Sequence, residues 1–177
     1  APIQVSWLGY PASIGMKAVD YRITDGYAEP LGMTEHLNTE ILWRMPDIFC
    51  CYQALEQCPA VIDHPPFEDN GYITFGCFNS FARVSDKALK AWAQIMAQIP
   101  DARLLLEIAG IDSPQFRADT EQRFKEQGLP LERVILEPRN KSNRFTLYNK
   151  IDIALDPFPS VGGTTSSLAS WTSTDGA

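Results

Sequence analysis

The sequence has few of the residues that most often build metal or redox centres. Its 177 residues include four cysteines and two histidines, and no two cysteines form a CxxC pair. His36 and His64 lie far apart in the chain. Because zinc sites use closely spaced Cys and His ligands, we expect no metal site. The four cysteines are predicted to be buried or partly buried free thiols in the reducing cytoplasm.

Positive charge is scarce as well. The 15 Lys and Arg residues against 22 Asp and Glu residues give a net charge of −7, which argues against nucleic acids and membrane surfaces as partners. No apolar run approaches the length of a membrane span. No GxxxxGK[ST] motif occurs and no GxGxxG follows a strand, so a Walker loop and an ordinary dinucleotide site lack support.

From about residue 72 onward, segments typical of strands and helices alternate. Ser85 and Asp86 are typical of a helix start, and a second helix from Ser113 to Gly128 carries Phe116, Thr120 and Phe124 on one stripe. Such alternation predicts an α/β fold, in which helices flank a Rossmann-like parallel sheet. The expected strands are 72–78, 103–110, 133–138 and 151–158, with a short helix over 143–150.

The first part of the chain reads differently. Residues 1–58 contain aromatic-rich strand-like pieces without a strong helix pattern, and the proline-rich residues 59–71 are predicted to be a linker. The following unit is expected to span 72–177. The chain starts within a strand-like phrase, so we expect it to be part of a longer protein.

Small and polar residues follow the first and fourth strands of this second unit. The simplest doubly wound order, 3-2-1-4, places these two segments opposite each other at the switch point, where such folds bind ligands. Gly162 and Gly163 allow close approach of a ligand to the backbone, and Thr164 and Thr165 would open the next helix. Free N–H groups at that helix end suit a phosphate, with cations expected from Arg83, Lys141 and Arg144.

The same residues also have plainer interpretations. A Gly-Gly-Thr-Thr turn can be a capped connection between a strand and a helix, and each of the three cations can be a solvated surface charge. The convergence of two segments at one predicted switch point favours the binding site.

Three stretches of the chain carry a resemblance to a known family: "APIQVSWLGYPASIGMKAVDYRITD" (1–25), "FGCFNSFARVSDKALKAWAQIM" (75–96) and "LYNKIDIALDPFPSVGGTTSSLASW" (147–171). They resemble the catalytic region of O-linked N-acetylglucosamine transferases, most closely the bacterial members and the related SPINDLY-type proteins. The resemblance implies a GT-B glycosyltransferase that transfers N-acetylglucosamine from UDP-GlcNAc to protein Ser or Thr, without a metal cofactor. It also implies a tetratricopeptide superhelix. Residues 1–58 would then end the N-terminal lobe, and 72–177 would be part of the C-terminal, donor-binding lobe.

By this resemblance, Ser80 and Arg83 stand near the donor diphosphate, and Gly163, Thr164 and Thr165 form the diphosphate-binding turn. Lys141 and Arg144 would flank the uracil. The catalytic residues remain unassigned, because neither histidine lies in a matching motif.

Two positions depart from the family pattern. Arg144 replaces a usual histidine, and Leu168 replaces an acidic residue that holds the ribose hydroxyls, for which leucine offers no acceptor. A non-catalytic binding or interaction module that keeps the fold therefore remains an alternative to an enzyme.

The acceptor protein and the exact donor sugar stay open. Finally, the 3-2-1-4 order leaves one edge of strand 151–155 unpaired, so we expect self-association through residues 151–171.

Overall fold

The computed structural model describes residues 1–53, 56, 58–139 and 145–173. Contacts within the chain divide it into two compact units, residues 1–53 and 54–177. The division falls before the predicted linker, and the assignment of the two units to lobes of a larger enzyme stays a prediction. None of the helices in the described residues is long and apolar enough to cross a membrane.

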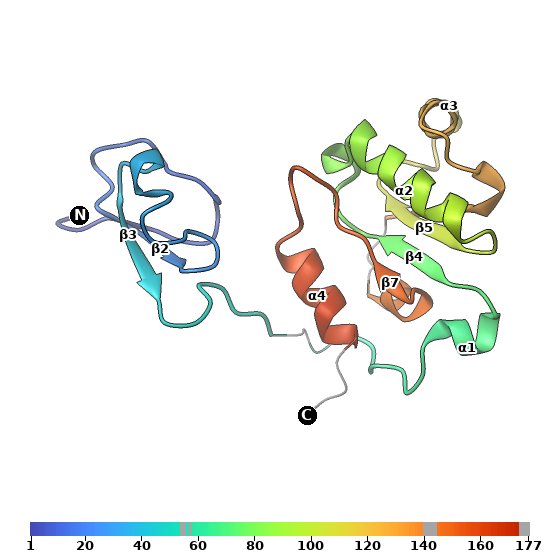
Figure 1. Cartoon of the computed structure of the whole chain (residues 1–177), viewed down its shortest axis with the longest axis horizontal. Helices are drawn as coiled ribbons and strands as arrows, with labels where there is room; N and C mark the ends of the chain where they lie inside the picture. Colours follow the sequence, from blue (N-terminus) through green and yellow to red (C-terminus); the bar gives the residue numbers. More distant parts are fainter. Residues whose placement is uncertain (54–55, 57, 140–144, 174–177) are drawn as a thin grey trace. The chain divides into compact units, whose positions relative to one another are not determined.

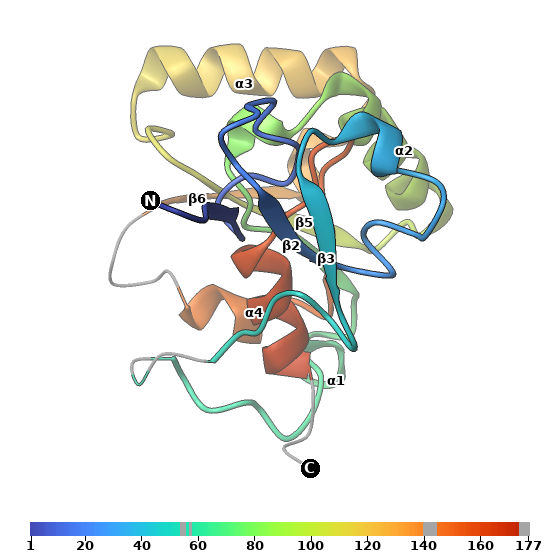
Figure 2. The same ribbon diagram turned by 90° about the vertical axis from the view of Figure 1, so that its left-hand side faces the viewer.

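The first unit is built on a parallel sheet of order β1-β2-β3. β1 spans Val5–Ser6, β2 Tyr21–Asp25 and β3 Ile41–Met45, and a 3-10 turn, η1, covers Glu35–Leu37. β2 and β3 run side by side in Figure 2. Their register pairs Tyr21 with Ile41 and Ile23 with Trp43, so apolar side chains share one face of the sheet.

Buried charges hold the loops of this unit. Arg22 donates from Nη1 to Glu29 Oε1 at 2.6 Å and to Asn38 Oδ1 at 2.9 Å. Glu40 is buried and accepts from the Ser13 hydroxyl at 2.6 Å and the Ile14 N–H at 2.7 Å. Burial opposes ionisation of Glu40, but these hydrogen bonds prevail and lower its pKa to about 2. Glu40 therefore ties the loop at 13–14 to the start of β3.

The second unit contains a four-stranded parallel sheet of order β6-β5-β4-β7, which confirms the predicted 3-2-1-4 order. β4 spans Thr74–Cys77, β5 Arg103–Ile108, β6 Val134–Pro138 and β7 Ile153–Ala154. The helices are α1 (Pro66–Asn70), α2 (Asp86–Gln98), α3 (Pro114–Glu126) and α4 (Thr164–Ser173). Short 3-10 turns are η2 (Phe81–Arg83), η3 (Leu131–Arg133) and η4 (Thr146–Lys150).

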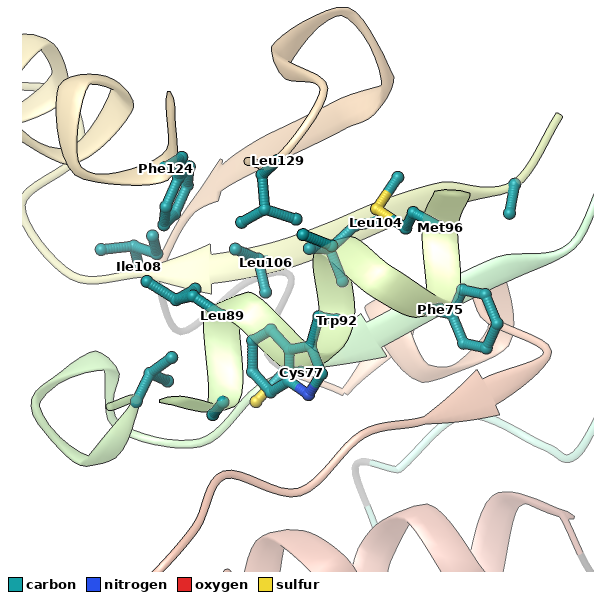
Figure 3. Close-up of a cluster of buried hydrophobic side chains, with 14 of the residues drawn as sticks. Phe75, Cys77, Leu89, Trp92, Met96, Leu104, Leu106, Ile108, Phe124 and Leu129 are labelled. Atoms are coloured by element: carbon teal, nitrogen blue, oxygen red, sulfur yellow. The ribbon is translucent and has the colours of Figure 1, made fainter. Parts of the chain in front are cut away.

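The core of this unit lies between α2, α3 and one face of the sheet. Leu89, Trp92 and Met96 of α2 pack with Leu104, Leu106 and Ile108 of β5, as Figure 3 shows. The predicted start of α2 is confirmed, because the Ser85 hydroxyl accepts from the Ala88 N–H at 3.2 Å. Figure 1 and Figure 2 both show α2 and α3 on one side of the sheet and α4 on the other.

The predicted stripe of α3 is buried at Thr120 and Phe124, whereas Phe116 is 38% exposed. Two other local predictions need correction. Within the predicted linker, Pro66 at the first helical position starts the short helix α1. The last strand is much shorter than predicted, because β7 pairs with β4 only at Phe75↔Ile153 and Gly76↔Ala154.

Candidate functional site

The chain segments that follow β4 and β7 lie side by side at the carboxyl edge of the sheet. Arg83 at the end of η2 donates from Nη1 to the Val161 carbonyl at 3.2 Å. The Ser85 hydroxyl donates to the Phe158 carbonyl at 2.7 Å. The structure therefore brings together the two segments that the sequence places at the switch point.

A group of four residues, the Asp156 cluster, joins the same two segments. It consists of Asn79, Asp156, Gly162 and Ser166. Asn79 donates from Nδ2 to Asp156 Oδ1 at 2.9 Å. The Ser166 hydroxyl lies 2.8 Å from Oδ1 and 2.6 Å from Oδ2 of the same carboxylate. A β-carbon at Gly162 would lie only 2.5 Å from Asn79 Oδ1 and from Ser166 Oγ, so glycine is required by this packing.

The helix α4 starts at this edge and presents its amino end there. Its first backbone hydrogen bond runs from the Ser167 N–H to the Gly163 carbonyl at 3.1 Å. The preceding N–H groups of an α-helix have no partner within the helix, and the helix dipole makes this end positive. Such an end is suited to a phosphate or another anion.

The four consecutive hydroxyl residues of this turn divide into two pairs. The Ser166 hydroxyl donates to Asp156, and the Ser167 hydroxyl donates to the Gly163 carbonyl at 3.2 Å. Within the described part of the chain, the hydroxyls of Thr164 and Thr165 make no hydrogen bond. Thr164 and Thr165 are therefore the hydroxyls available to a ligand.

The structure describes most of the predicted site residues but not all of them. Arg83 and Ser80 are exposed near the turn, with Ser80 immediately before η2. Gly162, Gly163, Thr164 and Thr165 form the turn and the start of α4. Lys141 and Arg144 lie outside the described residues, as does the side chain of Leu168.

Two hollows lie beside this edge of the second unit. A cavity of about 680 Å³ runs along β7 beneath α4, and its lining includes Asn79, Asp156, Thr165 and Ser166. A second hollow of about 540 Å³ lies between the segment 80–84 and α3. Asn79 lines the first hollow and Ser80 lines the second, so both hollows border the segment that follows β4.

One feature near the site was not foreseen from the sequence, whereas the burial of Cys77 was expected. Arg139, just after β6, donates to Glu107 Oε2 at 3.0 Å and to the Phe78 carbonyl at 2.5 Å. Glu107 is buried in β5, and a carboxylate directly after the apolar run 104–106 was the available signal for such a pair. Burial raises the pKa of the Cys77 thiol to about 11, so this cysteine is a protonated core residue rather than a nucleophile.

In the described residues, no group of three or more His, Cys, Asp and Glu side chains is arranged to hold a metal ion. His64 forms an exposed pair with Asp69, with Nε2 and Oδ2 at 2.9 Å, and this hydrogen bond raises the pKa of His64. The chemistry offered at the switch point is therefore hydrogen bonding and positive charge from Arg83 and the helix end.

Comparison with known proteins gives consistent matches. A model of glycosyl transferase family 41 matches residues 1–58. The Arabidopsis thaliana "Probable UDP-N-acetylglucosamine--peptide N-acetylglucosaminyltransferase SPINDLY" is 38% identical over 167 residues, which cover 93% of this chain and 18% of that protein. The corresponding SEC protein of Arabidopsis thaliana is 27% identical over 183 residues, covering 97% of this chain and 18% of that protein.

A solved structure shows the same relationship. The chain is similar to a K341M mutant of Thermobaculum terrenum O-GlcNAc transferase, with a TM-score of 0.86 and 32% identity, over 97% of this chain and 32% of that one. This match confirms the predicted α/β fold with Rossmann-like parallel sheets, as part of a GT-B architecture. The chain spans about a fifth of the length of the curated relatives that it matches. In sequence and in fold, the chain therefore matches part of an O-GlcNAc transferase and SPINDLY-type catalytic region.

Proposed function

We propose that this chain supplies the donor-nucleotide-binding part of a UDP-sugar-dependent glycosyltransferase that transfers N-acetylglucosamine to protein Ser or Thr. The names of the curated relatives support this donor and this type of acceptor. One observation carries the proposal: Arg83 and the amino end of α4 meet at the switch point of a parallel sheet.

The residues at this point match the chemistry of a departing nucleoside diphosphate. The N–H groups at the start of α4 and the hydroxyls of Thr164 and Thr165 would bind phosphate oxygens. Arg83 would add a charge-assisted hydrogen bond from the opposite segment. When the bond between sugar and UDP breaks, negative charge grows on the diphosphate, and donors already in place stabilise it. Ser80, Lys141 and Arg144 complete the proposed donor contacts.

The chain by itself is proposed to bind UDP weakly and to transfer no sugar. Catalysis in a GT-B enzyme needs a donor and an acceptor held by two lobes, and the chain covers only about a third of the bacterial structure. We place the chain in a longer cytoplasmic enzyme with a tetratricopeptide region and a protein acceptor. No metal is required in this scheme, since the cations are supplied by side chains and the helix end.

The test compares three alanine substitutions by calorimetry with UDP. Arg83→Ala is expected to weaken UDP binding about tenfold, and Thr164→Ala a few-fold, from the usual worth of charged and neutral hydrogen bonds. Arg117→Ala is the matched control, because Arg117 lies on α3 and pairs with Glu121 at 3.6 Å. Equal losses in all three variants would contradict the site.

A second candidate is a binding module that keeps the fold without turnover. Leu168 favours it, because the resembling enzymes carry an acidic residue there and leucine cannot accept a hydrogen bond from ribose. Leu168→Glu separates the two: tighter UDP binding by this variant would show that the rest of the nucleotide site is intact. A radiolabelled sugar-transfer assay on the unchanged chain completes the test, and turnover would contradict the proposed dependence on other segments.

A further inference from the structure

The Asp156 carboxylate connects three parts of the second unit that are distant in sequence. It follows β7, while Asn79 follows β4 at a separation of 77 residues. Ser166 belongs to the first turn of α4, ten residues after Asp156. A single side chain thus links the central strand, its neighbour and the amino end of the helix.

The packing around this carboxylate leaves little freedom in the turn. Gly162 lies so close to Asn79 and Ser166 that no β-carbon fits without displacing them. The single hydroxyl proton of Ser166 is shared between two carboxylate oxygens at 2.6 and 2.8 Å. The turn between β7 and α4 is therefore held from its inner side, while Arg83 reaches its backbone at Val161.

We propose that Asp156 is a positioning residue, which holds the first turn of α4 so that its N–H groups and the Thr164 and Thr165 hydroxyls face the donor diphosphate. This inference rests on the proposed function. A direct contact of Asp156 with the diphosphate is disfavoured, since two negative groups repel each other. A carboxylate beside the positive end of a helix, in contrast, also stabilises that end before any ligand binds.

Hydrogen exchange tests the positioning without any ligand. In Asp156→Asn and Ser166→Ala, amides of α4 should exchange about three- to tenfold faster, as expected for the loss of one or two hydrogen bonds. Ser166→Thr restores the hydroxyl and should restore protection. Ser167→Ala is the matched control, because among the described residues the Ser167 hydroxyl bonds only to the Gly163 carbonyl, within its own helix turn. Peptides from α2 report whether the unit remains folded.

Titration with UDP on the same variants tests the link to function. Asp156→Asn and Ser166→Ala should bind UDP about three- to tenfold more weakly, whereas Ser166→Thr and Ser167→Ala should bind like the unchanged chain. Unchanged exchange in α4 would overturn the positioning, whatever UDP does. Faster exchange with unchanged UDP affinity would overturn its role in binding. Absence of UDP binding by the unchanged chain would overturn the proposed function, and the exchange data would still report on the cluster.

Discussion

Gly76→Ala is the substitution whose effect follows most directly from the packing of the central strand. A β-carbon at Gly76 would lie 2.5 Å from Ile151 Cγ2 and 2.8 Å from Cδ1. Ordinary carbon contacts are about 3.5–4.0 Å, so the new methyl group would be about 1 Å too close. Overpacking of this kind costs about 1–3 kcal/mol, partly offset by about 0.4–1 kcal/mol from the stiffer unfolded chain. We expect a net loss of about 1–2 kcal/mol.

The assay is urea unfolding followed by circular dichroism at the helix wavelength. Within the residues that the structure describes, the four α-helices all lie in the second unit, so the helix signal reports on that unit. Ile151→Ala removes both close carbons, and Gly76→Ala should then cost much less. Ile151→Val removes Cδ1 but keeps Cγ2, the closer carbon, and should give only partial relief. If Gly76→Ala instead lowers the free energy of unfolding equally in the unchanged chain, in Ile151→Ala and in Ile151→Val, the contact with Ile151 is refuted as the cause of the loss.

Three further predictions concern other parts of the chain. Ser13→Ala should raise the pKa of Glu40 from about 2 toward its usual 4.5, which NMR titration would measure. Because the pKa of Glu40 is depressed in the folded state, the contribution of this carboxylate to the free energy of unfolding is present above about pH 4.5 and is lost as the pH falls toward 2. A free energy of unfolding that stays constant between these pH values would contradict this prediction. Cys77, buried and with a pKa raised to about 11, should react with a thiol reagent at pH 8 only on unfolding, while exposed Cys51 reacts at once; mass spectrometry of labelled peptides distinguishes them. Among the described residues, β7 pairs only with β4, and Ile153 is 45% exposed. We therefore expect self-association through residues 151–171, which light scattering would measure. A monomer over a tenfold range of protein concentration would contradict this prediction.

Much of the second unit could be predicted because its local signals agree with its fold. Ser85 caps α2, apolar residues recur at helical spacing, and the alternation of strands and helices limits the sheet to few orders. The placement of Arg83 beside the turn after β7 followed from that order alone.

The finer features depend on contacts that local sequence does not encode. Nothing near Asp156 in the sequence indicates Asn79 as its partner, since the two meet only through the pairing of β4 with β7. Phe116 has the right spacing for the buried stripe of α3, yet it lies 38% exposed. The spacing of residues shows which of them share one side of a helix. How much of that side is buried depends on the neighbouring elements of the fold.

The position of β4 in the sheet has a consequence for the order of folding during synthesis. β4 is made before β5 and β6, but its second neighbour, β7, arrives only after both. The hydrogen bond from the Thr74 N–H to Asp152 spans 78 residues, so closing this side of the sheet requires a long loop. During synthesis on the ribosome, one edge of β4 therefore remains unpaired while α2, β5, α3 and β6 assemble. The switch point is the last region of the sheet to form, and an interruption of synthesis before residue 151 would leave a packed core without the switch point.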